Sequence, residues 1–210
     1  KGIGSWSLTG HSAEELSKKF TEMQDDSEVT AGFMWQKTTR ESKKYQLRGE
    51  ILSFIPVDKN VEIMLVTITN TGRMAQTVTP TAAIPLYGRS ADNIRDHRHV
   101  TSLLHRIETT DTGVLVTPTL SFDERGHQVN HMTYYCVGWS GNGEKPVDFY
   151  PTAEDFVGEG GNFERPYAIV KNAEGVKAGT KIEGLEAVGG LHFSEITLEP
   201  EEECSYLIFT

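Results

Sequence analysis

The sequence predicts an all-β fold: a large antiparallel sandwich with one short helix near the N-terminus. Most of the chain consists of short runs in which apolar and polar residues alternate, as in strands with one buried face. Turn residues separate these runs, and only one segment has a helical period. We expect one β-sandwich domain over 1–210, with the helix at about 12–23 and the sheets over about 30–210.

The predicted helix begins with a capping pair. Ser12 is followed three residues later by Glu15, so each can satisfy a free backbone N–H of the first turn. Leu16, Phe20 and Met23 then recur at spacings of four and three, which places them on one helical face. We expect this face to pack on other apolar residues.

Two strands are predicted most clearly. Over 45–51, Tyr45, Leu47 and Ile51 alternate with polar residues. The run from 61 alternates in the same way and ends at the turn Asn70-Thr71-Gly72. Further strand-like runs lie at 74–86, 100–108, 113–121, 131–139, 166–170, 191–198 and 205–209.

The segment 140–165 is rich in glycine and proline. We interpret it as a long ordered loop with a helical turn at 152–156, and long loops of compact domains are often functional. Its acidic residues are the most plausible group of catalytic carboxylates, although surface and capping roles fit them better. They are Asp148, Glu154, Asp155 and Glu159.

The charge and the cysteines exclude several classes of protein. The formal net charge of −10 argues against general nucleic-acid binding, which needs a basic surface. No apolar run is long enough to span a bilayer. Cys136 and Cys204 lie in apolar runs, so we expect reduced thiols. The chain shows no signal peptide, and we expect a cytoplasmic protein without a membrane partner. It begins with Lys1, which is compatible with a fragment.

The segment from Arg89 to Arg106 is basic and rich in histidine within an acidic chain. Arginine suits bidentate contacts with phosphate or carboxylate, so the segment is a candidate for anion binding or for contact with an acidic partner. The alternative is an Asp–Arg network that holds a loop. The candidate residues here are Arg95, Asp96, His97, Arg98, His99, His105 and Arg106.

A metal site is the weaker interpretation of this segment. His97 and His99 would share one face of a strand, but a zinc site needs further ligands that the fold would have to supply. We therefore expect no metal and no cofactor. Trp139, which closes a strand before a glycine-rich turn, is a candidate sugar contact, and packing at the rim of the core is the alternative. No nucleophile elbow, Walker loop or dinucleotide fingerprint occurs.

Four segments resemble, in the same order, the N-terminal domain of cellobiose phosphorylase and its relatives, glycoside hydrolase family 94. The strand VEIMLVTITNTG at 61–72 follows IPVDKN at 55–60, as it does in that family. The segment 149–166 resembles the family loop that ends in an Arg-Pro pair, here Arg165-Pro166. LEPEEE at 198–203 resembles the last hairpin. The phosphorylases of β-1,2-linked glucans are the most similar subgroup.

The resemblance implies a β-supersandwich of the galactose mutarotase type and a parent protein that phosphorolyses a β-glucoside with inversion. Inorganic phosphate would be the co-substrate, and the catalytic groups would lie in an (α/α)₆ barrel absent from this chain. We therefore expect a non-catalytic module that supports a homodimer and borders the site of a β-glucan oligosaccharide. Its partners would be that barrel and a second subunit. The alternatives are a free-standing carbohydrate-binding sandwich and a small metal-using hydrolase built on His97 and His99.

Overall fold

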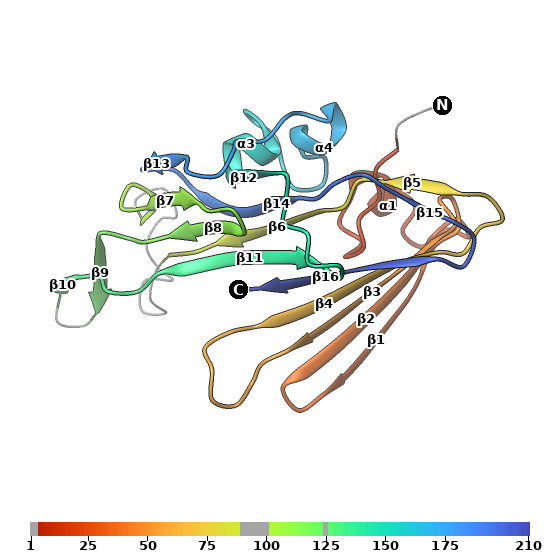
Figure 1. The fold of residues 1–210 in the computed structure, drawn as a ribbon, viewed down its shortest axis with the longest axis horizontal. Coiled ribbons are helices and arrows are strands. Elements are labelled where there is room, and N and C mark those ends of the chain that lie inside the picture. Colours follow the sequence, from red (N-terminus) through yellow and green to blue (C-terminus); the bar gives the residue numbers. More distant parts are fainter. Residues whose placement is uncertain (1–3, 89–100, 124–125) are drawn as a thin grey trace.

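The computed structural model describes residues 4–88, 101–123 and 126–210. In this part of the chain, strands form a nine-stranded antiparallel sheet with smaller sheets beside it (Figure 1). The predicted all-β antiparallel sandwich is thereby confirmed. Short helices accompany the strands, among them α1 (Ala13–Ser17), α3 (Ala153–Val157) and α4 (Tyr167–Lys171).

The large sheet runs, from edge to edge, through β1 (Asp26–Gly32), β2 (Trp35–Ser42), β3 (Leu47–Phe54), β4 (Ile63–Asn70), β16 (Glu203–Phe209), β11 (Tyr134–Ser140), β8 (Gly113–Val116), β7 (Arg106–Thr109) and β13 (Lys181–Glu183). The three-stranded sheet has the order β12 (Asp148–Thr152), β14 (Ala187–His192) and β6 (Thr81–Leu86). Two further pairs are β5 (Gln76–Val78) with β15 (Ile196–Leu198), and β9 (Leu120–Asp123) with β10 (Gly126–Val129).

The main core lies between the three-stranded sheet and the β4–β13 half of the large sheet. The two sheets interlock through glycines. A Cβ atom on Gly189 of β14 would overlap the side chain of Cys136 on β11. Likewise, a Cβ atom on Gly138 of β11 would lie 3.0 Å from the side chain of Leu191 on β14. Each glycine therefore makes room for a side chain of the opposite sheet.

A second, smaller core lies on the other face of the three-stranded sheet. Tyr150 and Val188 pack there against Phe156 of α3 and Ala168 of α4. The helices thus cover the face of β12 and β14 that points away from the large sheet (Figure 1). Thr152 caps α3, since its side chain accepts a hydrogen bond from the Asp155 N–H.

Tyr150 also ties this layer together through its hydroxyl group. The hydroxyl donates to the carbonyl oxygen of Ala173 at 2.6 Å, because a carbonyl can only accept. The same oxygen must then accept from Nδ1–H of His192, 2.8 Å away, which fixes the tautomer of that ring. Asp148 lies 3.4 Å from the same nitrogen. The cluster joins neighbouring strands to the loop around residue 173.

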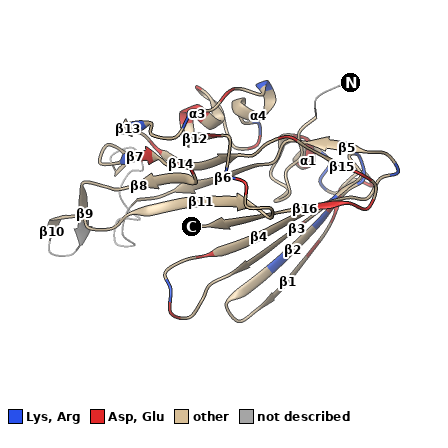
Figure 2. Cartoon of the chain, viewed as in Figure 1, with Lys and Arg blue, Asp and Glu red and all other residues tan. Residues whose placement is uncertain are grey.

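Part of the other face of the large sheet carries two rows of mainly apolar side chains. The register places Trp35, Phe54, Ile63 and Phe209 in one row, and Leu52, Leu65, Leu207 and Trp139 in another row on the same side. In Figure 2, β11 is drawn without a charged residue. Leu65 and Leu207 are 37% and 38% exposed, and Trp139 packs edge-on against Phe209 at 5.8 Å. We call these two rows the outer patch.

The predicted helix at 12–23 is wrong in extent. The helix covers only Ala13–Ser17 and buries none of its residues. Its capping pair is present, with Ser12 accepting from the Glu15 N–H. Phe20 has a φ of 67°, which ends any helical path, and its side chain is 90% exposed. The expected packing face therefore does not form.

Two other expectations change. The run at 166–170 is the helix α4 rather than a strand, because Pro166 sets an extended N-cap before one helical turn. Part of the expected loop 140–165 is the buried strand β12, while its expected helical turn at 152–156 corresponds to α3. Both cysteines are free thiols, as expected, with Cys136 buried.

Candidate functional site

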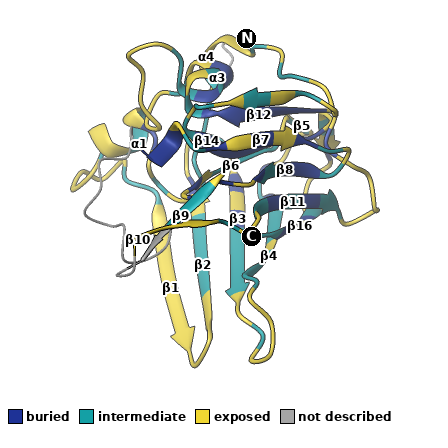
Figure 3. Ribbon diagram, turned by 90° about the vertical axis from the view of Figure 1, so that its left-hand side faces the viewer, coloured by how far each residue is buried: buried dark blue, intermediate teal, exposed yellow. Residues whose placement is uncertain are grey.

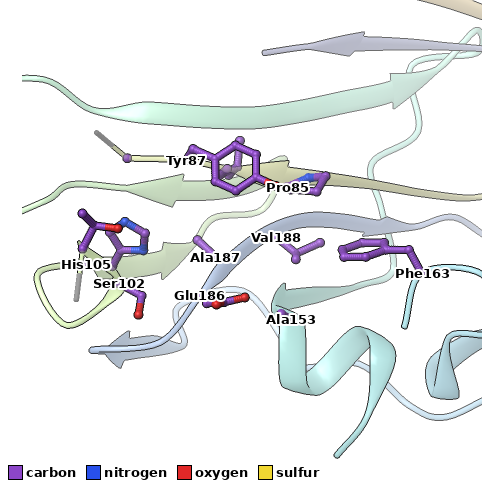
Figure 4. A pocket seen from close by; sticks show the side chains of 12 residues that line it. Pro85, Tyr87, Ser102, His105, Ala153, Phe163, Glu186, Ala187 and Val188 are labelled. Atoms are coloured by element: carbon purple, nitrogen blue, oxygen red, sulfur yellow. The ribbon is translucent and has the colours of Figure 1, made fainter. Parts of the chain in front are cut away.

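The candidate site is a hollow at the end of the sandwich where β6 ends and β14 begins (Figure 4). One wall comes from the end of β6, a second from the segment before β7, and a third from α3 and the loop that follows it. The lining residues are Pro85, Leu86, Tyr87, Gly88, Thr101, Ser102, His105, Ala153, Phe163, Glu186, Ala187 and Val188.

His105 is the buried polar group of this hollow. Its side chain is 4% exposed, and Nδ1 lies 3.1 Å from the carbonyl oxygen of Leu185. The carbonyl can only accept, so Nδ1 carries the proton. Nε2 is then an acceptor, and it is buried without a hydrogen-bond partner among the described residues. Such an atom favours a ligand or water that donates a hydrogen bond.

Burial also keeps the His105 ring neutral. Loss of solvation lowers its pKa below the ordinary value of 6.5, while the Leu185 carbonyl, the charge of Glu186 and the backbone of Gly88 oppose that shift. A neutral ring with a free Nε2 lone pair suits recognition of a hydroxyl group better than binding of an anion.

Two aromatic rings stand at the mouth of the hollow. Tyr87 is 51% exposed and Phe163 is 41% exposed. Figure 4 places Phe163 at one end of the hollow, and Ser102 and His105 at the other. Exposed rings beside a few polar groups are typical of sites that bind neutral, partly apolar ligands such as sugars.

The size of the hollow limits what enters it. Its free volume is about 30 Å³, which is room for one or two water molecules but not for a sugar ring. A sugar would therefore lie across the mouth, on the aromatic rings, and reach Nε2 of His105 through a hydroxyl or a bridging water.

Of the predicted site residues that the structure describes, His105 and Trp139 lie in different parts of the fold. Arg95, Asp96, His97, Arg98 and His99 lie outside the described residues. His105 lines the hollow, whereas Trp139 belongs to the outer patch. The exposed Arg165 follows Phe163 by two residues, and its backbone N–H donates to Asn162 Oδ1.

Arg106 makes local contacts. Its Nη1 donates to the carbonyl oxygen of His105 at 2.9 Å, and its Nε lies 3.5 Å from Glu183 of the neighbouring strand. The acidic residues of 148–159 also have local roles. Asp155 accepts a hydrogen bond from the hydroxyl of Thr152, its capping partner, and Asp148 Oδ1 lies 3.4 Å from Nδ1 of His192.

Glu154, Asp155 and Glu159 also line an open acidic hollow beside α3, with Glu174 opposite them. This arrangement by itself defines no acid–base pair for glycoside chemistry. In the described part of the chain, no group of three His, Cys, Asp or Glu side chains is placed to hold a metal ion.

Sequence reasoning missed Tyr87, Phe163 and Glu186. Their positions in the chain are far apart, and none belongs to a motif. Only the pairing of β6 with β14, where Leu86 lies opposite Ala187, brings Tyr87 and Glu186 to one end of the sheet. The glycine-rich composition around Phe163 was the one available signal, because it marked its loop as functional.

The buried state of His105 predicts a pH dependence of stability. Below pH about 6.5, His105 is protonated in the unfolded chain but remains neutral in the folded chain. The free energy of unfolding therefore falls as the pH decreases toward the folded-state pKa of His105. The replacement His105→Asn keeps a donor for Leu185 and removes this titration. We expect it to flatten the fall of unfolding free energy between pH 7.5 and 5.5, by at most about 1.4 kcal/mol per pH unit.

Urea unfolding at several pH values measures this effect. His131→Asn, at an exposed histidine, is the matched control and should keep the wild-type pH dependence. Equal slopes for wild type and His105→Asn would show that His105 does not titrate differently in the folded and unfolded chains.

The described part of the chain is a large antiparallel sandwich with a small hollow, lined in part by Tyr87 and Phe163, at one end. The family is more specific. A model of the glycosyl hydrolase 94 supersandwich domain matches residues 5–210, so the chain belongs to that family. The comparison with curated proteins found no match. No helix in the described ranges is long and apolar enough to cross a membrane.

Proposed function

We propose that this chain is the non-catalytic, carbohydrate-associated module of an inverting β-glucoside phosphorylase. In that role it supports a homodimer, packs against a catalytic (α/α)₆ barrel of the same polypeptide and borders the sugar site. Inorganic phosphate is the co-substrate of the whole enzyme and binds outside this module. The family membership supports this proposal.

The observation that carries the proposal is the outer patch. Leu65 of β4 and Leu207 of β16 are directly paired on neighbouring strands, and more than a third of each residue is exposed. A contiguous apolar sheet face of this kind usually marks an interaction surface. We assign the outer patch to the catalytic barrel, because a domain of the same polypeptide can cover the face permanently.

The hollow at His105 supports the role at the sugar site. Its mouth offers two aromatic rings and one unpaired acceptor, which suits the edge of a sugar-binding cleft. The hollow is shallow, so we expect weak binding by the isolated module and tight binding only where another domain completes the cleft.

Titration with a β-1,2-linked gluco-oligosaccharide, followed by NMR, tests this role. We expect chemical-shift changes at Tyr87, His105 and Phe163, and we expect Tyr87→Ala to remove them because it deletes half of the aromatic rim. The control Phe33→Ala removes another highly exposed ring, far from the hollow in sequence, and should leave the titration unchanged.

The same titration separates the alternative function. A free-standing carbohydrate-binding sandwich should bind the sugar tightly without any other domain. If binding is tight and is lost on Trp139→Ala rather than Tyr87→Ala, the outer patch is a sugar-binding face and the module is a binding protein in its own right.

A further inference from the structure

The two edges of the large sheet differ in how well they are protected. The edge strand β13 has three residues, of which Lys181 and Glu183 are charged. The opposite edge strand, β1, has seven residues, and every one of them is exposed (Figure 3). The charged residues of β1 are Asp26 and Glu28, and the strand contains neither lysine nor proline, the residues that most often protect an open edge.

The hairpin that contains β1 determines which of its backbone groups are free. Gly32 pairs with Trp35 across a two-residue turn, and such a turn is closed by a hydrogen bond between the residues that flank it. Bonded and non-bonded pairs then alternate along the strand. Ser27, Val29 and Ala31 therefore direct their N–H and C=O groups away from β2, toward the open edge.

We propose that β1 pairs with β1 of a second copy of this chain, antiparallel about a two-fold axis at Val29. This inference rests on the homodimer proposed above and names its surface. In this register Val29 bonds its own counterpart, and Ser27 bonds Ala31 of the other copy. The backbone N–H and C=O groups of all three outward-facing residues then have hydrogen-bond partners, and all seven residues of β1 lie opposite a residue of the second copy.

The charges of β1 are compatible with this register and disfavour the one shifted toward the start of the strand. With the axis at Val29, Glu28 lies opposite Thr30 of the second copy and Asp26 lies opposite Gly32, so no carboxylate faces another. Moving the axis to Glu28 would place the two Glu28 side chains directly opposite each other, which is destabilising in a strand pair.

The exposed apolar residues at the two ends of β1 also match. Phe20 and Met23 precede the strand and are 90% and 62% exposed. Phe33 follows it at the hairpin turn and is 89% exposed. A two-fold antiparallel pairing brings the start of one strand beside the end of the other, so the two apolar groups meet twice in one dimer.

Sedimentation velocity of Val29→Pro, over a wide range of concentrations, tests the proposal. The proline removes an N–H that faces the open edge and leaves the β1–β2 ladder intact, so the chain should fold and the dimer should dissociate. The control Val29→Thr keeps the N–H group and the branched side chain and should remain a dimer. Thermal unfolding at low concentration verifies that both variants are folded.

Charge substitutions at Thr30 give an independent measurement. Thr30→Glu places a carboxylate opposite Glu28 of the second copy at two symmetric positions, and should weaken the dimer about tenfold. Thr30→Lys places opposite charges there and should tighten it. General damage to the strand would weaken the dimer in both variants. Pairing through β1 would weaken the Thr30→Glu dimer and tighten the Thr30→Lys dimer.

The outcomes separate this inference from the proposed homodimer. A wild-type dimer that Val29→Pro dissociates, with opposite effects of the two Thr30 variants, supports pairing through β1. A dimer that survives Val29→Pro overturns pairing through β1 and leaves the homodimer to another surface. A wild-type chain that stays monomeric at every concentration overturns both.

Discussion

Gly189→Ala should lower the free energy of unfolding by about 2–3 kcal/mol, a large loss for one methyl group. Its added Cβ would overlap the side chain of Cys136 on the opposite sheet. The backbone at Gly189 is not in the left-handed region, so alanine can adopt its conformation and the penalty is steric. The sheets must separate, or Cys136 must leave its position in the core.

A double-mutant cycle isolates this contact. Cys136→Gly alone removes a fully buried side chain and should also destabilise the protein. Combined with Gly189→Ala, it makes room for the new methyl group, so the double variant should be at least about 1 kcal/mol more stable than the sum of the single effects predicts. Strictly additive effects in urea unfolding would mean that the two sheets do not interlock here.

Association with the catalytic barrel should fall at least a hundredfold in the double variant Leu65→Lys/Leu207→Glu. Leu65 and Leu207 are 37% and 38% exposed, so covering the remainder contributes only about 0.5–1 kcal/mol each. The larger effect is the burial of two charged groups in an apolar interface, which costs several kcal/mol and brings the total above the ~2.7 kcal/mol of a hundredfold change. The two residues are cross-strand partners, so the new charges attract each other and preserve the sheet.

Calorimetry with the separately produced barrel measures this loss. Val57→Lys is the control, because Val57 is 91% exposed and lies outside the outer patch. Unchanged affinity of the double variant would assign the outer patch to another partner.

Several strands were predictable because their sequences match their surroundings. β4 alternates because its residues divide between the core and the outer patch: Val66 and Ile68 pack on the core, while Leu65 belongs to the patch. β1 and β2 gave no such signal, since neither face of β1 is buried and β2 is largely polar. Hydrophobic periodicity does not report a strand with two solvated faces.

The helix errors have a different cause. In the early segment the spacing of Leu16, Phe20 and Met23 fits a helix, but the backbone at Phe20 has a positive φ that no α-helix contains. Residues 167–171 are short, apolar and partly β-branched, which favours a strand when only local sequence is considered. Their contact with α3 and the core beneath it determines a helix instead, as tertiary packing often does for short segments.

The candidate site was the least predictable feature. The histidine-rich stretch drew attention to His105, and the structure gives this residue a buried ring with a free acceptor. Its aromatic neighbours come from positions 87 and 163, which only the sheet register and the loop after α3 bring close to it. No spacing rule in a sequence encodes such long-range proximity.

Phosphorolysis by the isolated chain is the most direct measurement of the central claim, that this module supports glucoside chemistry without performing it. The purified chain is incubated with β-glucan oligosaccharides and inorganic phosphate, and release of glucose 1-phosphate is followed. We expect no release above the rate without protein, and release when the catalytic barrel is present. Glucose 1-phosphate formed by this chain alone would contradict the claim.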